Sequence, residues 1–278
     1  MCLAIIALSA LPDIPVLVAA NRDEYHARPT APAGPWPDRP DIVAGRDLVA
    51  GGTWLGLTRG GRYALLTNYR APAGANPAAP SRGTLVEAFL RGDQPPADYA
   101  RDIHARGGLY NGFNLIVGDR GRSFYVGNRA QEPAELAPGV YGLSNHLLDT
   151  PWPKLTRVRS AVRDWLRTAV AEPDYEPLFA ALRDRVPAPD PALPDTGIGL
   201  ERERLLSSPF IVDPAYGTRS STVLALRRDG RGELHEIRYA PDGSAVGRED
   251  WLCAPAGAQC AAGLDASSPN QGEATWNM

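Results

Sequence analysis

Cys2 is the residue of this chain best suited to nucleophilic chemistry. If an aminopeptidase removes Met1, Cys2 carries a thiol and a free α-amine on one residue. An α-amine has an ordinary pKa of about 8, so at neutral pH it can act as the base for its own side chain. No histidine is then needed to form the reactive thiolate. The alternative is a small buried cysteine that begins an apolar strand.

Other common catalytic signatures are absent from the sequence. It has no phosphate-binding Gly-x-x-x-x-Gly-Lys loop, no His-Glu-x-x-His and no Cys-x-x-Cys. We therefore expect no metal site and no cofactor. The four histidines are scattered, and we assign them surface or structural roles: His26, His104, His146 and His235.

The first two apolar runs position polar residues beside Cys2. Residues 2–8 and 16–20 read as strands, and the prolines between them predict a turn. Two strands joined by a short turn pair antiparallel, so the end of the second returns to the start of the first. The charged residues after the second run, Arg22, Asp23 and Glu24, should then lie close to Cys2. A charged strand end in solvent is the alternative interpretation.

Composition limits the classes of function. The 278 residues are 44% apolar and 22% charged with a net charge of −3, which favours no nucleic-acid partner. No apolar stretch approaches the roughly 20 residues that span a bilayer, and the start lacks the basic region of a signal peptide. Three cysteines indicate a reducing, cytoplasmic setting, with Cys253 and Cys260 incidental in a tail. The oligomeric state is not predictable.

The order of expected elements indicates the fold class. Residues 26–40 hold five prolines and should form an extended loop. Hairpin-linked strands alternate with paired helices, which predicts helices stacked outside antiparallel sheets. We expect one domain over residues 1–251 and a flexible tail over 252–278. Further strands are expected over 41–45, 53–57, 62–68, 113–117, 123–126, 140–145, 220–226 and 233–239, and helices over 84–91, 97–106, from 151–153 onward, and 175–185.

Several motifs resemble the NRDE-motif family, also called the transport and Golgi organisation family. Most of the matching motifs lie in residues 1–70, and weaker motif matches extend the resemblance to about residue 240. The motifs are Met1-Cys2, Ala20-Asn21-Arg22-Asp23-Glu24, Arg28-Pro29-Thr30, Ala44-Gly45-Arg46-Asp47, Gly51-Gly52-Thr53-Trp54-Leu55-Gly56, Leu66-Thr67-Asn68-Tyr69-Arg70, Tyr110 to Leu115, Gly142 to Asn145, Trp152-Pro153-Lys154 and Gly217 to Thr222.

The resemblance implies an N-terminal-nucleophile hydrolase fold, a four-layer αββα sandwich similar to bile-salt hydrolase and penicillin V acylase. By that resemblance, Cys2 is the nucleophile of an amidohydrolase that cleaves a non-peptide C–N bond. Arg22 would hold the thiolate and Arg219 would organise the site. Asn68 and Asn145 would donate to a tetrahedral oxyanion. Asp23 completes the expected catalytic set, and we expect Glu24, Trp54 and Tyr69 to contact the substrate.

Arg22 and Asp23 are adjacent here, whereas two residues separate the corresponding pair in those acylases. Neighbours on a regular strand point to opposite faces. Both can face Cys2 only if the strand bends or ends there. Otherwise Arg22 pairs with Glu24 on one face and Asp23 supports the fold from the other. Asn68 and Asn145 could also be simple turn formers.

A second hypothesis is a carrier of a hydrophobic small molecule, such as haem or an acyl lipid, which the resembled family has been linked to handling. Trp36, Trp54, Tyr63 and Tyr69 would then line an apolar pocket. The alternative is that these aromatic residues belong to the core. The expected partner is thus a small-molecule amide or a hydrophobic ligand.

Overall fold

The opening hairpin lies inside one of two stacked sheets in the computed structural model, which describes residues 2–70, 75–254 and 261–262. Strands β1 (Cys2–Leu8) and β2 (Val16–Tyr25) pair antiparallel, as their apolar pattern predicts. Both are buried on both faces, since alternate side chains face a helix layer and the second sheet. This explains why their sequences are apolar throughout instead of alternating.

The described strands form two seven-stranded antiparallel sheets. In the first, the order is β10-β1-β2-β11-β12-β13-β14, and in the second β3 to β9 follow one another in sequence order. The remaining strands of the first sheet are β10 (Gly139–Leu143), β11 (Tyr216–Leu226), β12 (Gly232–Tyr239), β13 (Ala245–Cys253) and β14 (Ala261–Ala262). Those of the second are β3 (Thr30–Trp36), β4 (Arg39–Asp47), β5 (Leu55–Thr58), β6 (Tyr63–Asn68), β7 (Phe113–Gly118), β8 (Ser123–Gly127) and β9 (Ala134–Glu135).

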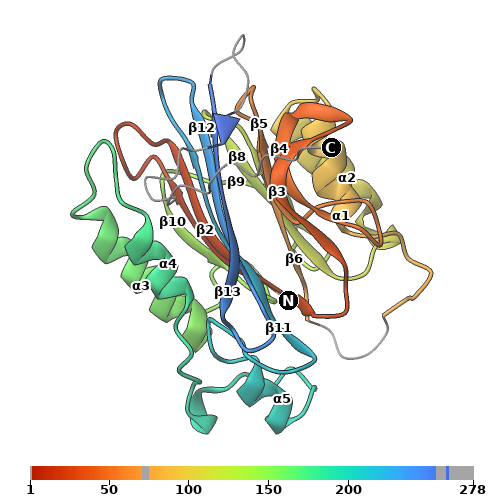
Figure 1. Cartoon of the computed structure of the whole chain (residues 1–278). Helices are drawn as coiled ribbons and strands as arrows, with labels where there is room; N and C mark the ends of the chain where they lie inside the picture. The colour runs from red at the N-terminus through yellow and green to blue at the C-terminus, as the bar shows by residue number, and fades with distance from the viewer. Residues whose placement is uncertain (1, 71–74, 255–260, 263–278) are drawn as a thin grey trace, which may run out of the picture.

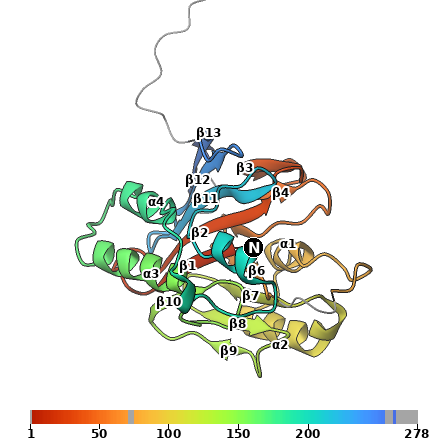
Figure 2. The ribbon, with the colours of Figure 1, turned by 90° about the horizontal axis from the view of Figure 1, so that it is seen from below.

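Helices cover the outer face of each sheet (Figures 1 and 2). On the second sheet lie α1 (Gly83–Arg91) and α2 (Pro96–Arg106), and on the first lie α3 (Pro153–Leu166) and α4 (Glu176–Leu182). The chain also forms η1 (Gly107–Leu109), η2 (Asp190–Ala192) and α5 (Leu200–Leu205). Three apolar cores fill the spaces between the four layers. The predicted αββα sandwich is confirmed.

The proline-rich stretch of residues 26–40 was wrongly expected to be a loop. It contains β3 and the start of β4, which form a hairpin at the edge of the second sheet. An edge strand tolerates proline because one side of it needs no ladder hydrogen bonds. The register is irregular around the prolines, shifting between Ala31 and Gly34 and again between Pro35 and Trp36.

The C-terminal part also differs from expectation at the start of the predicted tail. Strand β13 was not predicted, and its last residue, Cys253, is buried in the core between the sheets. Cys260 and most of the expected tail lie outside the described residues. Within the described part of the chain, no helix is both long and apolar enough to cross a membrane.

Candidate functional site

Three strands converge on the start of the chain. In the antiparallel register, Cys2 lies directly opposite Arg22, the cross-strand position that the hairpin predicts. On the other side of β2, Ser220 of β11 pairs with Arg22, and the register shifts between Thr218 and Ser220. This bulge lies beside the candidate site, where bulges often re-aim a side chain. The segment containing Arg219 is therefore excluded from the regular ladder.

Arg22 is a buried cation with an unused hydrogen-bond donor. Its side chain is almost fully enclosed, with a relative exposure of 5%, and its guanidinium lies 4.2 Å from the ring centroid of Trp54. Among the described residues, its Nη1 has no hydrogen-bond partner. A buried guanidinium N–H that lacks an acceptor is costly, unless an anion is bound there. Arg22 is thus arranged to receive negative charge.

Asp23 points to the other face of β2. It is buried, and its Oδ1 accepts a 2.7 Å hydrogen bond from Thr218 Oγ1, the residue opposite it on β11. Burial raises the pKa of Asp23, and the charge of Lys154 opposes that rise. Lys154 comes from the first turn of α3 and is 1% exposed. The strand therefore continues regularly, with Arg22 toward the second sheet and Asp23 toward the helices.

Glu24 lies at the rim of a cavity in front of Arg22. Its Oε2 lies 4.0 Å from Nε of Arg28, which binds Asp47 at 2.7 Å, so its ion pair is with Arg28 and not with Arg22. The cavity holds about 380 Å³. We call it the main cavity, and its walls include Arg22, Asp23, Glu24, Arg28, Asp47, Trp54, Asn68, Asn76, Arg82 and Asn111.

The two expected asparagines are joined to each other. Asn145 is completely buried, and its Nδ2 donates a 2.9 Å hydrogen bond to the backbone oxygen of Asn68. The backbone of Arg70 in turn donates to the oxygen of Asn145 at 2.7 Å. These bonds fix the end of β6 against the segment that follows β10. Asn68 lines the main cavity, so the second sheet brings an amide to the same space as Arg22.

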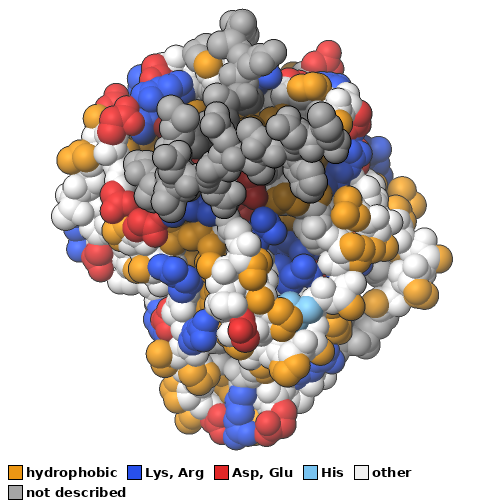
Figure 3. Space-filling model, in the orientation of Figure 1, with side chains coloured by type: hydrophobic (Ala, Val, Ile, Leu, Met, Phe, Trp, Pro, Cys, Tyr) orange, Lys and Arg blue, Asp and Glu red, His pale blue; other side chains and the backbone are white. Residues whose placement is uncertain are grey.

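Three of the predicted site residues do not line the main cavity: Asn145, Arg219 and Tyr69. Arg219 Nη1 donates to three backbone oxygens, those of Tyr25 (2.9 Å), His26 (3.3 Å) and Arg28 (3.1 Å), and so holds the turn after β2. It lines a neighbouring space of about 80 Å³ together with Arg22. Burial and the charge of Arg22 lower the pKa of Arg219. Figure 3 shows basic side chains gathered near the middle of the face on which β13 lies.

Tyr69 faces a third space and not the main cavity. Its ring lies 5.0 Å from that of His146. Of the other aromatic residues that could have lined an apolar pocket, Trp36 and Tyr63 are buried in the core. Only Trp54 of that set lines the main cavity, because the rest fill the spaces on the two faces of the second sheet.

Sequence reasoning missed three buried charged side chains behind the site, those of Lys154, Arg70 and Glu203. Lys154 belongs to the Trp152-Pro153-Lys154 motif, but nothing in that motif places it beside Asp23. Arg70 and Glu203 form a buried ion pair of 2.6 Å, and the Arg70 guanidinium lies 4.7 Å from the Trp152 ring. Among the described residues, no group of His, Cys, Asp and Glu side chains is arranged to hold a metal ion.

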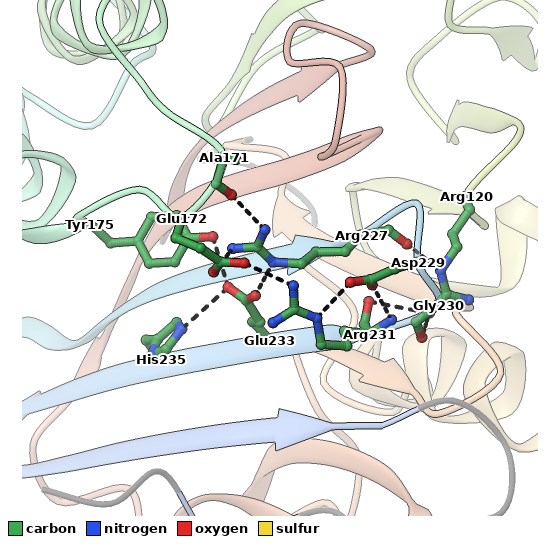
Figure 4. Close-up of polar contacts among 10 residues, drawn as sticks. All are labelled: Arg120, Ala171, Glu172, Tyr175, Arg227, Asp229, Gly230, Arg231, Glu233 and His235. Carbon is green, nitrogen blue, oxygen red and sulfur yellow. Dashed lines mark hydrogen bonds and ion pairs between the residues drawn. The ribbon is translucent and has the colours of Figure 1, made fainter.

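A second polar cluster occupies the opposite end of the first sheet (Figure 4). Arg227 is 4% exposed and donates through all three of its nitrogens: to Glu233, to the Ala171 oxygen at 2.7 Å and to Glu172 at 2.9 Å. Tyr175 also donates to Glu233, at 2.8 Å. Burial opposes ionisation of Glu233, but the nearby His235 ring, 3.8 Å away, and hydrogen bonds from Arg227 and Tyr175 lower its pKa to about 2. We call this group the distal cluster.

A family model described as "Transport and Golgi organisation 2" matches residues 1–241. The chain belongs to this family. A Bos taurus relative, "Transport and Golgi organization protein 2 homolog", is 40% identical over 238 residues, which cover 77% of this chain and 83% of the relative. The Homo sapiens protein of the same description is 38% identical over 232 residues with the same coverage. The family resemblance stated from the motifs is confirmed.

The fold of this family member is similar to that of a solved hydrolase. The crystal structure of a mutant conjugated bile acid hydrolase from Clostridium perfringens aligns with a TM-score of 0.50 at 8% identity. The alignment covers 92% of this chain and 98% of that one. At so low an identity the likeness shows the fold and not the reaction. The structural alignment thereby supports the N-terminal-nucleophile hydrolase fold that is expected from the motifs.

Proposed function

We propose that this protein is a cysteine amidohydrolase of the N-terminal-nucleophile type that cleaves a non-peptide amide C–N bond through Cys2. The observation that carries the proposal is the position of Cys2 opposite Arg22, a buried guanidinium whose Nη1 has no partner among the described residues. A cation placed there stabilises a thiolate relative to a thiol. The few cysteines favour a reducing, cytoplasmic setting in which a free thiol persists.

In the proposed reaction the α-amine of Cys2 takes the thiol proton after Met1 is removed. The thiolate attacks the amide carbon and forms a C–S bond, and the leaving amine takes the proton from the Cys2 α-ammonium as the C–N bond breaks. Water then hydrolyses the thioester, which releases the acyl group as a carboxylic acid and restores the thiol. Asn145 uses one hydrogen of its amide on Asn68, and we assign the second, with the Asn68 amide, to the oxyanion. Asp23 and Arg219 act as positioning residues, from the far face of β2 and from its turn.

The charge of the main cavity favours this function over the carrier of a hydrophobic molecule. Three arginines and two residues whose carboxylates face this side line the cavity: Arg22, Arg28, Arg82, Glu24 and Asp47. An apolar ligand would strip water from these groups without replacing their hydrogen bonds. Small-molecule sites are usually apolar with a few polar groups, so such a wall indicates a polar substrate.

Intact mass with a limiting thiol alkylator tests the proposal. We expect loss of Met1 and rapid single labelling at Cys2 in the wild type, and no rapid labelling in Cys2→Ala. Cys253→Ala is the matched control, because Cys253 is buried and should not contribute. Retained Met1, or equal labelling rates in the wild type and Cys2→Ala, would overturn the proposal. Any amide hydrolysis found by screening must likewise disappear in Cys2→Ala.

A further inference from the structure

The main cavity opens beside a second space with a different charge. This space, which we call the side chamber, holds about 240 Å³ and shares part of its wall with the main cavity. The shared wall consists of Asn76, Ala79, Arg82 and Asn111. The side chamber is thus close enough to receive the far end of a molecule whose amide lies in the main cavity.

The described lining of the side chamber is basic. It contains Arg82 and Arg129, two asparagine side chains and the phenol groups of Tyr69 and Tyr110, but no aspartate or glutamate. The main cavity, in contrast, is also lined by the acidic residues Glu24 and Asp47. Guanidinium and amide N–H groups are the donors that recognise a carboxylate. The side chamber therefore favours an anion, whereas the main cavity carries charges of both signs.

Hydrogen bonds hold the side chamber in shape before any ligand binds. Asn76 and Asn111 bond to each other twice: the Asn76 backbone donates to Asn111 Oδ1 at 2.8 Å, and Asn111 Nδ2 donates to the Asn76 oxygen at 2.9 Å. Asn128 Nδ2 donates to the Gly107 and Tyr110 oxygens, both at 3.0 Å. Such a preformed wall lowers the entropy cost of binding.

Gly108 shows that the chamber is open where η1 borders it. A Cβ built on Gly108 would meet no atom within 4 Å, and its φ is one that other residues adopt. Gly108 lines the chamber, so a larger side chain there would extend into open space without displacing a neighbour. This position therefore allows the chamber to be filled while the packing stays intact.

We propose that the side chamber binds a carboxylate carried by the substrate, so that the amide cleaved at Cys2 belongs to a molecule with an anionic end. The inference rests on the proposed function for the position of the amide. The carboxylate can belong to the amine portion, as in an N-acyl amino acid, or to the acyl portion, as in the monoamide of a dicarboxylic acid. Both place an anion at a distance from the amide bond.

Binding of dansyl-γ-aminobutyrate and its methyl ester, followed by fluorescence titration, tests the chamber directly. The probe is a sulfonamide, so the reading does not depend on amide cleavage. We expect the acid to bind about tenfold tighter than the ester, since a charge-assisted bond is lost in the ester. The preference should shrink as salt is raised, because Arg129 is exposed. Equal binding of acid and ester would overturn the proposal.

Variants then locate the bound probe. Arg129→Glu should remove the preference for the acid, whereas Arg167→Glu, at an exposed arginine after α3, should retain it. Gly108→Leu should weaken binding of the acid, whereas Gly60→Leu, in the turn between β5 and β6, should not. Unchanged binding in both Arg129→Glu and Gly108→Leu would mean that the probe lies elsewhere, and would overturn the proposal.

Turnover assays separate this inference from the proposed function. N-acyl amino acids and dicarboxylic monoamides should be cleaved in preference to matched neutral amides, and the preferred series identifies which portion carries the anion. Cleavage of neutral amides at equal or higher kcat/KM would overturn the side chamber as a carboxylate site but leave the hydrolase intact. Acid-selective binding with no amide cleavage in any series would overturn the proposed hydrolase but leave the side chamber as a carboxylate site.

Discussion

The two ends of the first sheet each bury an arginine, but they treat its charge differently. Arg227 in the distal cluster uses every nitrogen on a protein acceptor, and its relative exposure is 4%. Arg22 at the other end is 5% exposed, yet its Nη1 finds no acceptor among the described residues, and a cavity lies in front of it. Burial alone does not distinguish a structural arginine from a functional one. The number of satisfied donors does.

The difference also separates stability from function. In the distal cluster every nitrogen of the buried arginine has an acceptor, and this geometry favours one arrangement of the chain. Removal of one partner leaves the other charge buried without compensation. A buried arginine with an N–H that lacks an acceptor lowers the stability of the free protein, and it gains a hydrogen bond when an anion binds. Functional sites are commonly less than optimally stable for this reason.

The largest expected effect is a stability difference between the two arginines. Arg227→Met should lower the free energy of unfolding by about 3–5 kcal/mol, because Glu233 is left buried and charged. Arg22→Met should change it by less than about 1 kcal/mol or raise it, since it removes a buried donor with no acceptor. Urea unfolding of both variants at pH 7 measures the contrast. Equal destabilisation would show that the two ends are built alike.

The next effect is on the reactivity of Cys2. Arg22→Met should slow alkylation of Cys2 at pH 7 by about tenfold, because the thiol pKa rises when the neighbouring cation is lost. Arg46→Met is the matched control, because its guanidinium also lies over a tryptophan, 4.6 Å from the Trp36 ring. An unchanged rate in Arg22→Met would remove the assigned role of Arg22.

A smaller effect concerns pH and the distal cluster. Burial alone would lower the pKa of His235, but the nearby Glu233 carboxylate, 3.8 Å from Nε2, and a hydrogen bond with Asp250 raise it above the ordinary 6.5. The protonated ring thus stabilises the fold fully below about pH 6.5, and this contribution is lost as pH rises through the raised pKa. The stability lost over this range is the free energy by which folding favours the protonated ring over the neutral one.

Urea midpoints between pH 6 and pH 9 check this dependence. His235→Asn should flatten the decline, whereas His104→Asn, at a histidine whose partner Glu132 is largely exposed, should leave it in place. A decline that persists unchanged in His235→Asn would assign the pH dependence to other groups.

The smallest effect is the coupling between Arg22 and Trp54. A cation over an indole face is stabilised by about 0.5–1 kcal/mol at exposed sites and by about 2 kcal/mol when it is desolvated, as Arg22 is. A double-mutant cycle of Arg22→Met and Trp54→Phe should give a coupling free energy at the low end of this range, because phenylalanine keeps a weaker ring. A coupling of zero would mean that the stack does not hold Arg22 in place.

The apolar periodicity of the sequence predicted those strands and helices whose formation depends mainly on their own residues. The apolar runs of β1 and β2 and the apolar face of α3 are recorded in their own residues, so both were correctly expected. The β3–β4 hairpin was missed because proline normally signals a loop, and the tolerance of an edge strand depends on its place in the sheet. Strand β13 was missed because its solvent-facing side chains give it little apolar periodicity.

The site was predictable only in part, for a related reason. Arg22, Asp23 and Glu24 follow the apolar run of β2 directly, so hairpin geometry brings this end of β2 beside Cys2 and places Arg22 opposite it. Lys154 reaches Asp23 from another layer, and Tyr69 turns away from the main cavity just beyond the end of β6. These placements depend on how layers stack, and no spacing within the sequence encodes them.

The central place of the opening hairpin has a consequence for synthesis. Strands β1 and β2 leave the ribosome long before their outer neighbours, β10 and β11, which begin at Gly139 and Tyr216. Until those are made, two apolar strands present unpaired edges, which invite pairing with other chains. Long sequence separation also slows folding. Nascent chains of this protein should therefore depend on chaperones, and slower translation should increase aggregation.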